Sequence, residues 1–281
     1  MKAYIIYHPE EALKNASFID MFKNNGLKYG IYFEYISYYK YKSYPVPDLV
    51  VNRTRDYTVS LWYEKHGACV FHSSLITKIS NDKYLTIKYL EEKLPDNILK
   101  TKWCPDSYLY SEHELRDYYK SNELIRDRFI IKSLNGHGGT EVFYVSDLQS
   151  QKKALSKLAG KDCIVQEVVD SDSNDIRVYI VGGRIYVAIL RHGNEDFRSN
   201  YSLGGCVSEY KLNHNQKEYI EKFIEAFGGD KLGMAGIDFI LDKNDNLIFN
   251  ELEEMVGSRM LYKCTDKDIV SDYLSWIHTR L

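Results

Sequence analysis

Three acidic side chains near the C-terminus have the types and spacing to bind a metal ion. Asp238 lies in one apolar run, and Glu251 and Glu253 lie in a second run after a short polar segment. Folding the two runs into a hairpin sets Asp238 opposite Glu251 and Leu241 opposite Ile248. Because strand side chains alternate between faces, Glu251 and Glu253 share one face. Three carboxylates in one patch repel unless cations join them, and hard oxygen ligands suit Mg²⁺ bound to phosphate.

An ordinary explanation exists for the same acids, because acidic residues are common on exposed strands. The patch, however, has basic neighbours in sequence. Apolar residues alternate on either side of Gly182-Gly183 over residues 176–188, which predicts a β-hairpin closed by a glycine turn. Arg177 lies in that hairpin and Arg191 follows it. The run Asp196-Phe197-Arg198-Ser199-Asn200 comes next, so cations for an anionic ligand are available.

A glycine-rich loop is a second candidate for anion binding. Lys132 ends an expected strand, 128–132, and Gly136, Gly138 and Gly139 precede the next expected strand. Glycines permit backbone conformations that point N–H groups at an anion. The loop joins two strands and therefore differs from a Walker A motif, which needs a following helix. A glycine-rich hairpin with a solvent-facing Lys132 is the alternative.

The expected strand 163–169 carries two polar residues, Gln166 and Glu167, between apolar ones. Backbone groups around Gln166, Glu167 and Val168 are able to read the edge of an adenine, and a capped strand end is the alternative.

The first 80 residues predict a small parallel sheet covered by helices, because β-α-β units alternate along them. Strands are expected at 2–7, 30–36, 49–53 and 68–71, and helices at 10–25 and 58–66. Residues 40–47 are expected to form a loop. Further helices are expected at 82–94, 147–159, 216–227 and 265–281. We therefore predict three domains, at 1–80, 81–165 and 166–281.

Composition limits the class of protein. The chain has 281 residues, 44% hydrophobic and 27% charged, which is ordinary for a globular protein. A net charge of -3 argues against a nucleic-acid binder that works by bulk electrostatics. Five scattered cysteines without a Cys-x-x-Cys pair indicate neither disulfides nor zinc. No apolar run approaches the roughly 20 residues of a membrane span, so we expect a cytoplasmic protein.

These pieces, in this order, resemble the ATP-grasp superfamily, and within it the branch of RimK-like glutamate ligases and glutathione synthetases. The resemblance covers residues 50–262 approximately. It depends on Asn81-Asp82-Lys83, Lys132 with its glycine loop, Val165-Gln166-Glu167, Asp175-Ile176-Arg177-Val178, the run 196–200 with Gly204-Gly205, and Gly236-Ile237-Asp238 with Glu251. It implies an α/β fold: a small N-terminal parallel α/β domain, then two α+β subdomains that sandwich ATP.

The resemblance also implies a task for each matching residue. Lys83 and Lys132 are expected to neutralise the α- and β-phosphates, and the loop 136–139 to close over them as a flap. Gln166, Glu167 and Val168 are expected to form the adenine hinge.

At the reacting end of the nucleotide, Arg198 and Asn200 are expected to contact the transferring phosphate and one metal. Asp238 and Glu251 are expected to hold two Mg²⁺ ions, with Mn²⁺ as an alternative. Arg177 or Arg191 would assist in stabilising charge.

The sequence departs from the family pattern after Glu251. Glu253 stands where the family has asparagine, and a glutamate there still ligates Mg²⁺ but adds a negative charge. Asn250 is an alternative ligand in register, although Glu251 and Glu253 keep both ligands on one face. The usual Pro-Gly loop is missing. Arg259 either pairs with a substrate carboxylate or is a plain surface arginine.

The function implied is an ATP- and Mg²⁺-dependent carboxylate–amine ligase that works through an acylphosphate. A small-molecule kinase and a non-catalytic ATP-binding module are the alternatives. The expected partners are small-molecule, peptide or carrier-bound substrates, with no nucleic acid and no membrane. A homo-oligomer is an open option.

Overall fold

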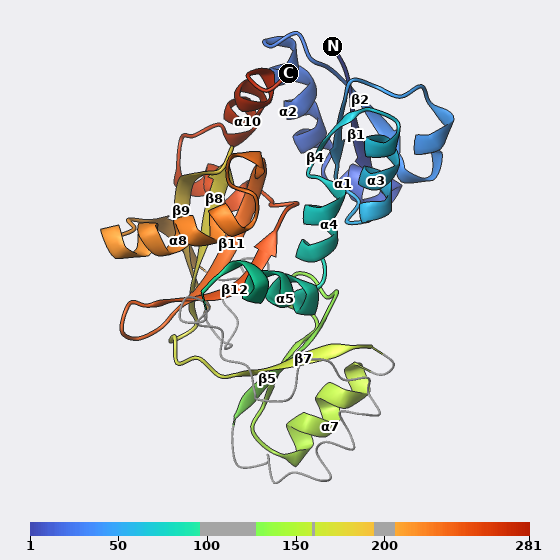
Figure 1. The fold of residues 1–281 in the computed structure, drawn as a ribbon. Coiled ribbons are helices and arrows are strands. Elements are labelled where there is room, and N and C mark those ends of the chain that lie inside the picture. The colour runs from blue at the N-terminus through green and yellow to red at the C-terminus, as the bar shows by residue number, and fades with distance from the viewer. Residues whose placement is uncertain (96–127, 159–160, 194–205) are drawn as a thin grey trace.

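The computed structural model describes residues 1–95, 128–158, 161–193 and 206–281. They form three separate sheets with helices packed against them (Figure 1). The N-terminal sheet and the small sheet that contains β5 and β7 lie toward opposite ends of the molecule (Figure 1). Of the helices in these ranges, none combines the length and apolar character needed to cross a membrane.

The N-terminal unit is the parallel α/β domain that the sequence predicted. Its strand order is β2-β1-β3-β4, and every pair is parallel. Strand β1 is apolar on both faces, as a parallel strand covered on both sides requires. Its elements are β1 (Lys2–Tyr7), α1 (Pro9–Lys14), α2 (Ala16–Leu27), β2 (Tyr32–Ser37), the 3₁₀ helix η1 (Tyr38–Ser43), β3 (Leu49–Asn52), α3 (Tyr57–Lys65) and β4 (Cys69–Phe71).

Two local expectations for this unit were wrong. The helix expected at 10–25 is two helices that meet at Asn15, whose side chain donates to the Glu11 carbonyl. Part of the segment expected as a loop, residues 40–47, belongs to η1, which buries Tyr41. Helix α4 (Ser74–Ser80), which begins with Ser73 as its cap, was not predicted from the sequence.

The small sheet has the antiparallel order β6-β5-β7. Strand β5 is fully buried, and helix α7 packs on the sheet through Ala154 and Leu155. Asp147 caps α7 with a capping box. The elements are β5 (Phe129–Ser133), β6 (Val142–Val145), α7 (Leu148–Lys157) and β7 (Cys163–Glu167).

The large sheet has the antiparallel order β10-β9-β8-β11-β12. The predicted glycine turn is confirmed: Gly182 and Gly183, with φ of 57° and 74°, join β8 to β9. The elements are β8 (Asn174–Val181), β9 (Arg184–His192), β10 (Cys206–Tyr210), α8 (His214–Ala226), η4 (Gly229–Lys231), β11 (Met234–Leu241), β12 (Leu247–Glu253), α9 (Arg259–Cys264) and α10 (Ile269–His278).

Two cores cover the two faces of the large sheet. On one face, α4, α5 (Lys83–Lys93) and α8 share a core with alternate residues of β8 and β11. On the other face, α9 and α10 share a core with α2 and with β1 of the N-terminal unit. The contact between α10 and α2 joins the C-terminal helix to the N-terminal unit (Figure 1). The domain boundaries near residues 80 and 165 stay predictions.

A β-bulge corrects the predicted hairpin register. Asp238 does pair with Glu251, but Phe239 pairs with Phe249, so Asn250 is an extra residue in β12. Leu241 therefore pairs with Leu247 and not with Ile248. A bulge inserts one residue into one strand and re-aims the side chains beside it.

Candidate active site

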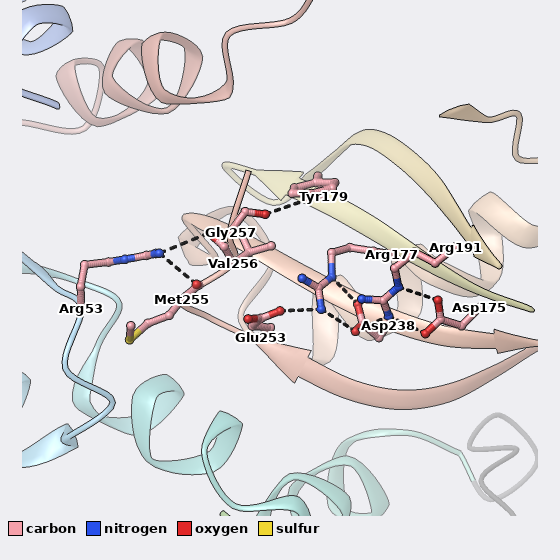
Figure 2. Close-up of polar contacts among 10 residues, drawn as sticks. All are labelled: Arg53, Asp175, Arg177, Tyr179, Arg191, Asp238, Glu253, Met255, Val256 and Gly257. Carbon is pink, nitrogen blue, oxygen red and sulfur yellow. Dashed lines mark hydrogen bonds and ion pairs between the residues drawn. The ribbon is translucent and has the colours of Figure 1, made fainter. Parts of the chain in front are cut away.

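The predicted acids Asp238 and Glu253 converge on one side chain, Arg177. Arg177 on β8 donates through Nε to Oδ1 of Asp238 at 2.8 Å and through Nη2 to Oδ2 at 2.7 Å. The same Nη2 lies 2.5 Å from Oε2 of Glu253 (Figure 2). A guanidinium that binds both oxygens of a carboxylate fixes its geometry as well as its charge.

A second arginine extends this network. Arg191 on β9 donates from Nη2 to Oδ2 of Asp238 at 2.7 Å and also forms a two-pronged pair with Asp175 (Figure 2). Both arginines and Asp238 are buried. Arginines of the same sheet therefore neutralise the neighbouring carboxylates Asp175, Asp238 and Glu253.

The network sets the protonation of its members. Burial acts to raise the pKa of Asp238, but Arg177 and Arg191 outweigh it and lower the pKa to about 2. Asp238 is thus ionised at neutral pH. Glu253 behaves differently, because burial raises its pKa above the ordinary value even with Arg177 beside it.

Lys132 reaches the same region from the small sheet. It lies on β5, is buried, and donates from Nζ to Oδ1 of Asn250 at 2.6 Å. Burial lowers the pKa of Lys132 to about 8, with Glu251 opposing the shift and Lys83 adding to it. A lysine from one sheet therefore meets the bulged strand of the other, and the solvent-facing alternative for Lys132 was wrong.

The glycine-rich loop is attached to Lys83. Asp82 caps α5, and Lys83 at the first position of that helix donates from Nζ to the carbonyls of Gly136, at 2.7 Å, and Leu134, at 3.3 Å. Gly138 and Gly139 have positive φ, of 66° and 75°. The two predicted lysines and the predicted loop are thus neighbours.

The donor atoms at this site are compatible with Mg²⁺. Glu251 is half-buried, and its carboxylate makes no hydrogen bond or ion pair with any residue that the structure describes. Asp238 accepts three hydrogen bonds, which leaves one of about four lone-pair positions. Within the described ranges, however, no group of three or more His, Cys, Asp or Glu side chains is arranged to hold a metal. The metal-ligand roles of Asp238, Glu251 and Glu253 stay predictions.

Other predicted residues lie apart from this cluster or outside the described chain. Gln166 is buried near the end of β7, Glu167 is exposed and Val168 is half-buried, so the adenine role stays a prediction. Arg198 and Asn200 lie outside the described residues. Arg259 is exposed and has no ion pair among the described residues.

Sequence reasoning missed the contact between the N-terminal unit and β12. Arg53 follows β3, is buried, and donates from Nη2 to the carbonyls of Met255, at 2.9 Å, and Val256, at 3.3 Å (Figure 2). Asn81 donates to Oε1 of the buried Glu254 at 2.8 Å. The available signal was a polar run, Asn52-Arg53-Thr54-Arg55, directly after a buried strand.

The sequence profile of the RimK-like ATP-grasp domain matches residues 82–277, which include Lys83, Lys132, Asp238 and Glu251. This chain belongs to that family. The expected class, a ligase of the ATP-grasp superfamily, is therefore confirmed at the level of the family.

Individual relatives are more distant. The chain is 28% identical over 224 residues to the uncharacterized protein MG011 of Mycoplasma genitalium, covering 79% of this chain and 71% of the relative. It is 24% identical to the glutamate–LysW ligase ArgX of Sulfolobus acidocaldarius, and the match covers 76% of this chain and 74% of the relative.

A solved structure with a similar fold is the D-alanine–D-alanine ligase of Bacillus anthracis in complex with ATP. Superposition of the two chains gives a TM-score of 0.73 at 16% sequence identity. It covers 100% of this chain and 98% of the ligase. The expected ATP-grasp fold class is thereby confirmed.

Proposed function

We propose that this protein is an ATP- and Mg²⁺-dependent carboxylate–amine ligase that forms an amide bond through an acylphosphate. The observation that carries the proposal is the meeting of Lys132 from the small sheet with Asn250, beside Asp238 and Glu251, on the large sheet. Cations and acids that converge between two sheets suit a nucleoside triphosphate and its metal, because phosphoryl transfer depends on positioning and charge neutralisation. Membership of the ATP-grasp family supports ATP as the nucleotide.

In the first step, an oxygen of a substrate carboxylate attacks the γ-phosphorus of ATP, and the bond from that phosphorus to the β,γ-bridging oxygen breaks. The products are an acylphosphate and ADP. Lys132, a buried ammonium, would attract phosphate oxygens strongly because little water screens its charge. Lys83 would hold the glycine-rich loop over the phosphates through its two carbonyl contacts.

In the second step, an amine attacks the acyl carbon, phosphate leaves and the amine loses a proton. Arg177 and Arg191 are committed to carboxylates, so their part is to keep Asp238 ionised and fixed. Glu251 and the remaining lone pair of Asp238 would hold Mg²⁺, which supplies further neutralisation of the phosphates when bound.

The test is release of ADP and phosphate from ATP and Mg²⁺ by the full chain, with amino acids and dipeptides offered singly and in pairs. We expect phosphate release that requires two compounds together. ADP without free phosphate would instead identify a kinase. Stabilisation by ATP without any ATP consumption across the panel would contradict the ligase and leave an ATP-binding module.

A matched pair of variants links the activity to the site. Lys132→Met keeps the length of the buried side chain and removes its charge, so we expect turnover to fall at least about 100-fold, as for loss of a transition-state cation. Lys153→Met, on the exposed face of α7, should leave turnover unchanged. Equal turnover in both variants would show that Lys132 does not take part.

A further inference from the structure

The carboxyl ends of β1 and β3 in the N-terminal sheet have no role in the proposed ATP site. The chain passes from β1 to β2 on one side and then to β3 on the other, so the strand order reverses between β1 and β3. In open parallel sheets, ligands bind outside the carboxyl ends of the strands at such a reversal. Here His8 follows β1, and residues 53–55 follow β3.

This end of the sheet is joined to the end of β12, the strand that carries Glu251. Arg53 bonds to the carbonyls of Met255 and Val256, which come two and three residues after Glu253 (Figure 2). The carboxyl end of β3 and the carboxyl end of β12 are thus held side by side. A molecule bound at the carboxyl end of β3 would therefore lie near the end of the strand that carries Glu251.

The loop after β3 holds the backbone of Arg55 in a fixed conformation. Oδ1 of Asn52 accepts from the Thr54 backbone at 3.0 Å and from its hydroxyl at 2.7 Å, and Nδ2 of Asn52 donates to the Asp56 carbonyl at 3.0 Å. Between these contacts Arg55 has a φ of 63°, in the left-handed region. A residue with a side chain rarely adopts that conformation, and it persists only where surrounding contacts enforce it.

The Arg55 guanidinium has no hydrogen bond or ion pair within the described chain. The neighbouring acid, Asp56, is occupied: it accepts from the Thr58 backbone at 2.9 Å and from the Tyr38 hydroxyl at 2.9 Å. Arg55 is only partly exposed. A guanidinium that forms no ion pair with any described residue is a candidate for binding an anionic ligand.

Arg55 lies close enough to three other parts of the protein to act on their charged groups. Its charge acts on Glu11 of α1, on His137 of the glycine-rich loop and on Glu254 after β12. An anion bound by Arg55 would therefore lie close to the glycine-rich loop and to the end of β12.

We propose that Arg55 binds the α-carboxylate of an amino acid that supplies the attacking amine, an inference that rests on the proposed ligase function. A guanidinium clamps both oxygens of a carboxylate. A carboxylate held in that way is not free to attack ATP, which assigns it to the amine substrate wherever the phosphorylated substrate has a single carboxylate. Arg55 thereby selects amino acids over amines that lack a carboxylate.

The test measures binding directly. Calorimetric titrations use the full chain with Mg²⁺ and a non-hydrolysable ATP analogue, against the common amino acids and the α-carboxamide of each one that binds. We expect at least one amino acid to bind, and its carboxamide to bind about 10- to 100-fold more weakly, because a charged hydrogen-bonded pair is lost.

Two variants and a control locate the effect. Arg55→Asn keeps a residue that tolerates positive φ, and it should bind the amino acid and the carboxamide with equal, weak affinity. Arg55→Lys should recover part of the discrimination. Arg184→Ala removes an exposed arginine at the far end of β9 and should match the unaltered protein. The ATP analogue should bind all four proteins equally.

Two results would overturn the inference: no amino acid binds the unaltered protein, or Arg55→Asn retains the preference for the carboxylate. Neither depends on turnover. Amino-acid binding that requires Arg55 but gives no phosphate release from any pair of compounds would contradict the ligase and leave the carboxylate site standing.

Discussion

At the residue scale, the two acids that pair across the hairpin have different surroundings. Asp238 is fully buried and tied to Arg177 and Arg191, whereas Glu251, directly opposite, has no hydrogen bond within the described chain. A buried charge that loses its partner is costly, since the remaining charge stays desolvated. One acid therefore belongs to the framework of the site, and the other is available to a ligand.

This difference predicts a large loss of stability for one substitution and a small change for a similar one. Asp238→Asn should lower the free energy of unfolding by about 3–5 kcal/mol, because two buried arginines lose the carboxylate that they share and keep only one acidic partner each. Glu251→Gln should change it by less than about 1 kcal/mol. Urea unfolding measures both values, and equal losses would show that Glu251 is also a structural partner.

His72 gives a pH dependence that can be tested separately from the site. Its side chain is buried and its Nε2 has no partner in the described chain. Burial, with a further contribution from Arg53, lowers the pKa of His72 from 6.5 to about 3. The unfolded chain therefore binds a proton below pH 6.5 that the folded chain excludes down to about pH 3. The stability that His72 contributes is fully present above pH 6.5 and is lost as the pH falls through this window.

We expect acidification from pH 7.5 to pH 5 to cost the unaltered protein about 2 kcal/mol through His72. A His72→Gln variant should lack that part of the pH dependence, although the substitution lowers stability at every pH by burying an amide. The measurement is the difference between the two proteins in unfolding free energy at each pH. A constant difference would contradict the prediction.

At the element scale, the bulge in β12 and the glycine-rich loop bring the two antiparallel sheets together. The bulge adds Asn250, whose side chain accepts from Lys132. The loop leaves β5 after Ser133, the residue that follows Lys132, and is attached to α5 by Lys83. The local conformation of each element thus controls a contact between sheets.

The loop offers a matched pair of glycine substitutions. A Cβ on Gly136 would overlap the Ser133 hydroxyl and lie 2.8 Å from Oε2 of Glu141, whereas a Cβ on Gly138 would meet nothing within 4 Å. Gly138→Ala costs only about 1–2 kcal/mol of backbone strain at its positive φ. We expect Gly136→Ala to weaken ATP binding more than Gly138→Ala does, measured by titration with the ATP analogue. The reverse order would mean that backbone conformation matters more than packing.

At the scale of the whole molecule, one core joins the two ends of the chain. Helix α10 buries Leu274 and Tyr273 in a cluster that also holds Ile5 of β1, Phe22 of α2 and Ile189 of β9. The N-terminal sheet and the large sheet share this core. If one sheet unfolded alone, the core residues of the other would be exposed to water. We infer that they unfold together.

Leu274→Ala tests this coupling. Leu274 is fully buried, so its truncation should cost about 2–5 kcal/mol. Leu13→Ala, at an α1 residue that is 81% exposed, should cost less than about 0.5 kcal/mol. Thermal unfolding followed by both fluorescence and circular dichroism should show one transition, shifted only in the first variant. Two separate transitions would show that the units are independent.

The sequence by itself determined the elements and much of the candidate site. Local patterns predicted the parallel N-terminal sheet, the Gly182-Gly183 hairpin and the pairing of Asp238 with Glu251, because strand alternation and turn chemistry act over a few residues. The family motifs predicted the ATP-grasp class and the candidate lysines, of which Lys132 is buried beside the acids.

Only the tertiary structure decided which charges meet. Arg177 is 61 residues from Asp238, Lys132 is 118 from Asn250, and Arg53 is 202 from Met255. The extra residue at Asn250 shifted the predicted register by one, since a bulge depends on how β12 fits its neighbour and leaves no periodic signal. Contacts between residues so far apart depend on how sheets pack, and no local pattern in the sequence encodes that packing.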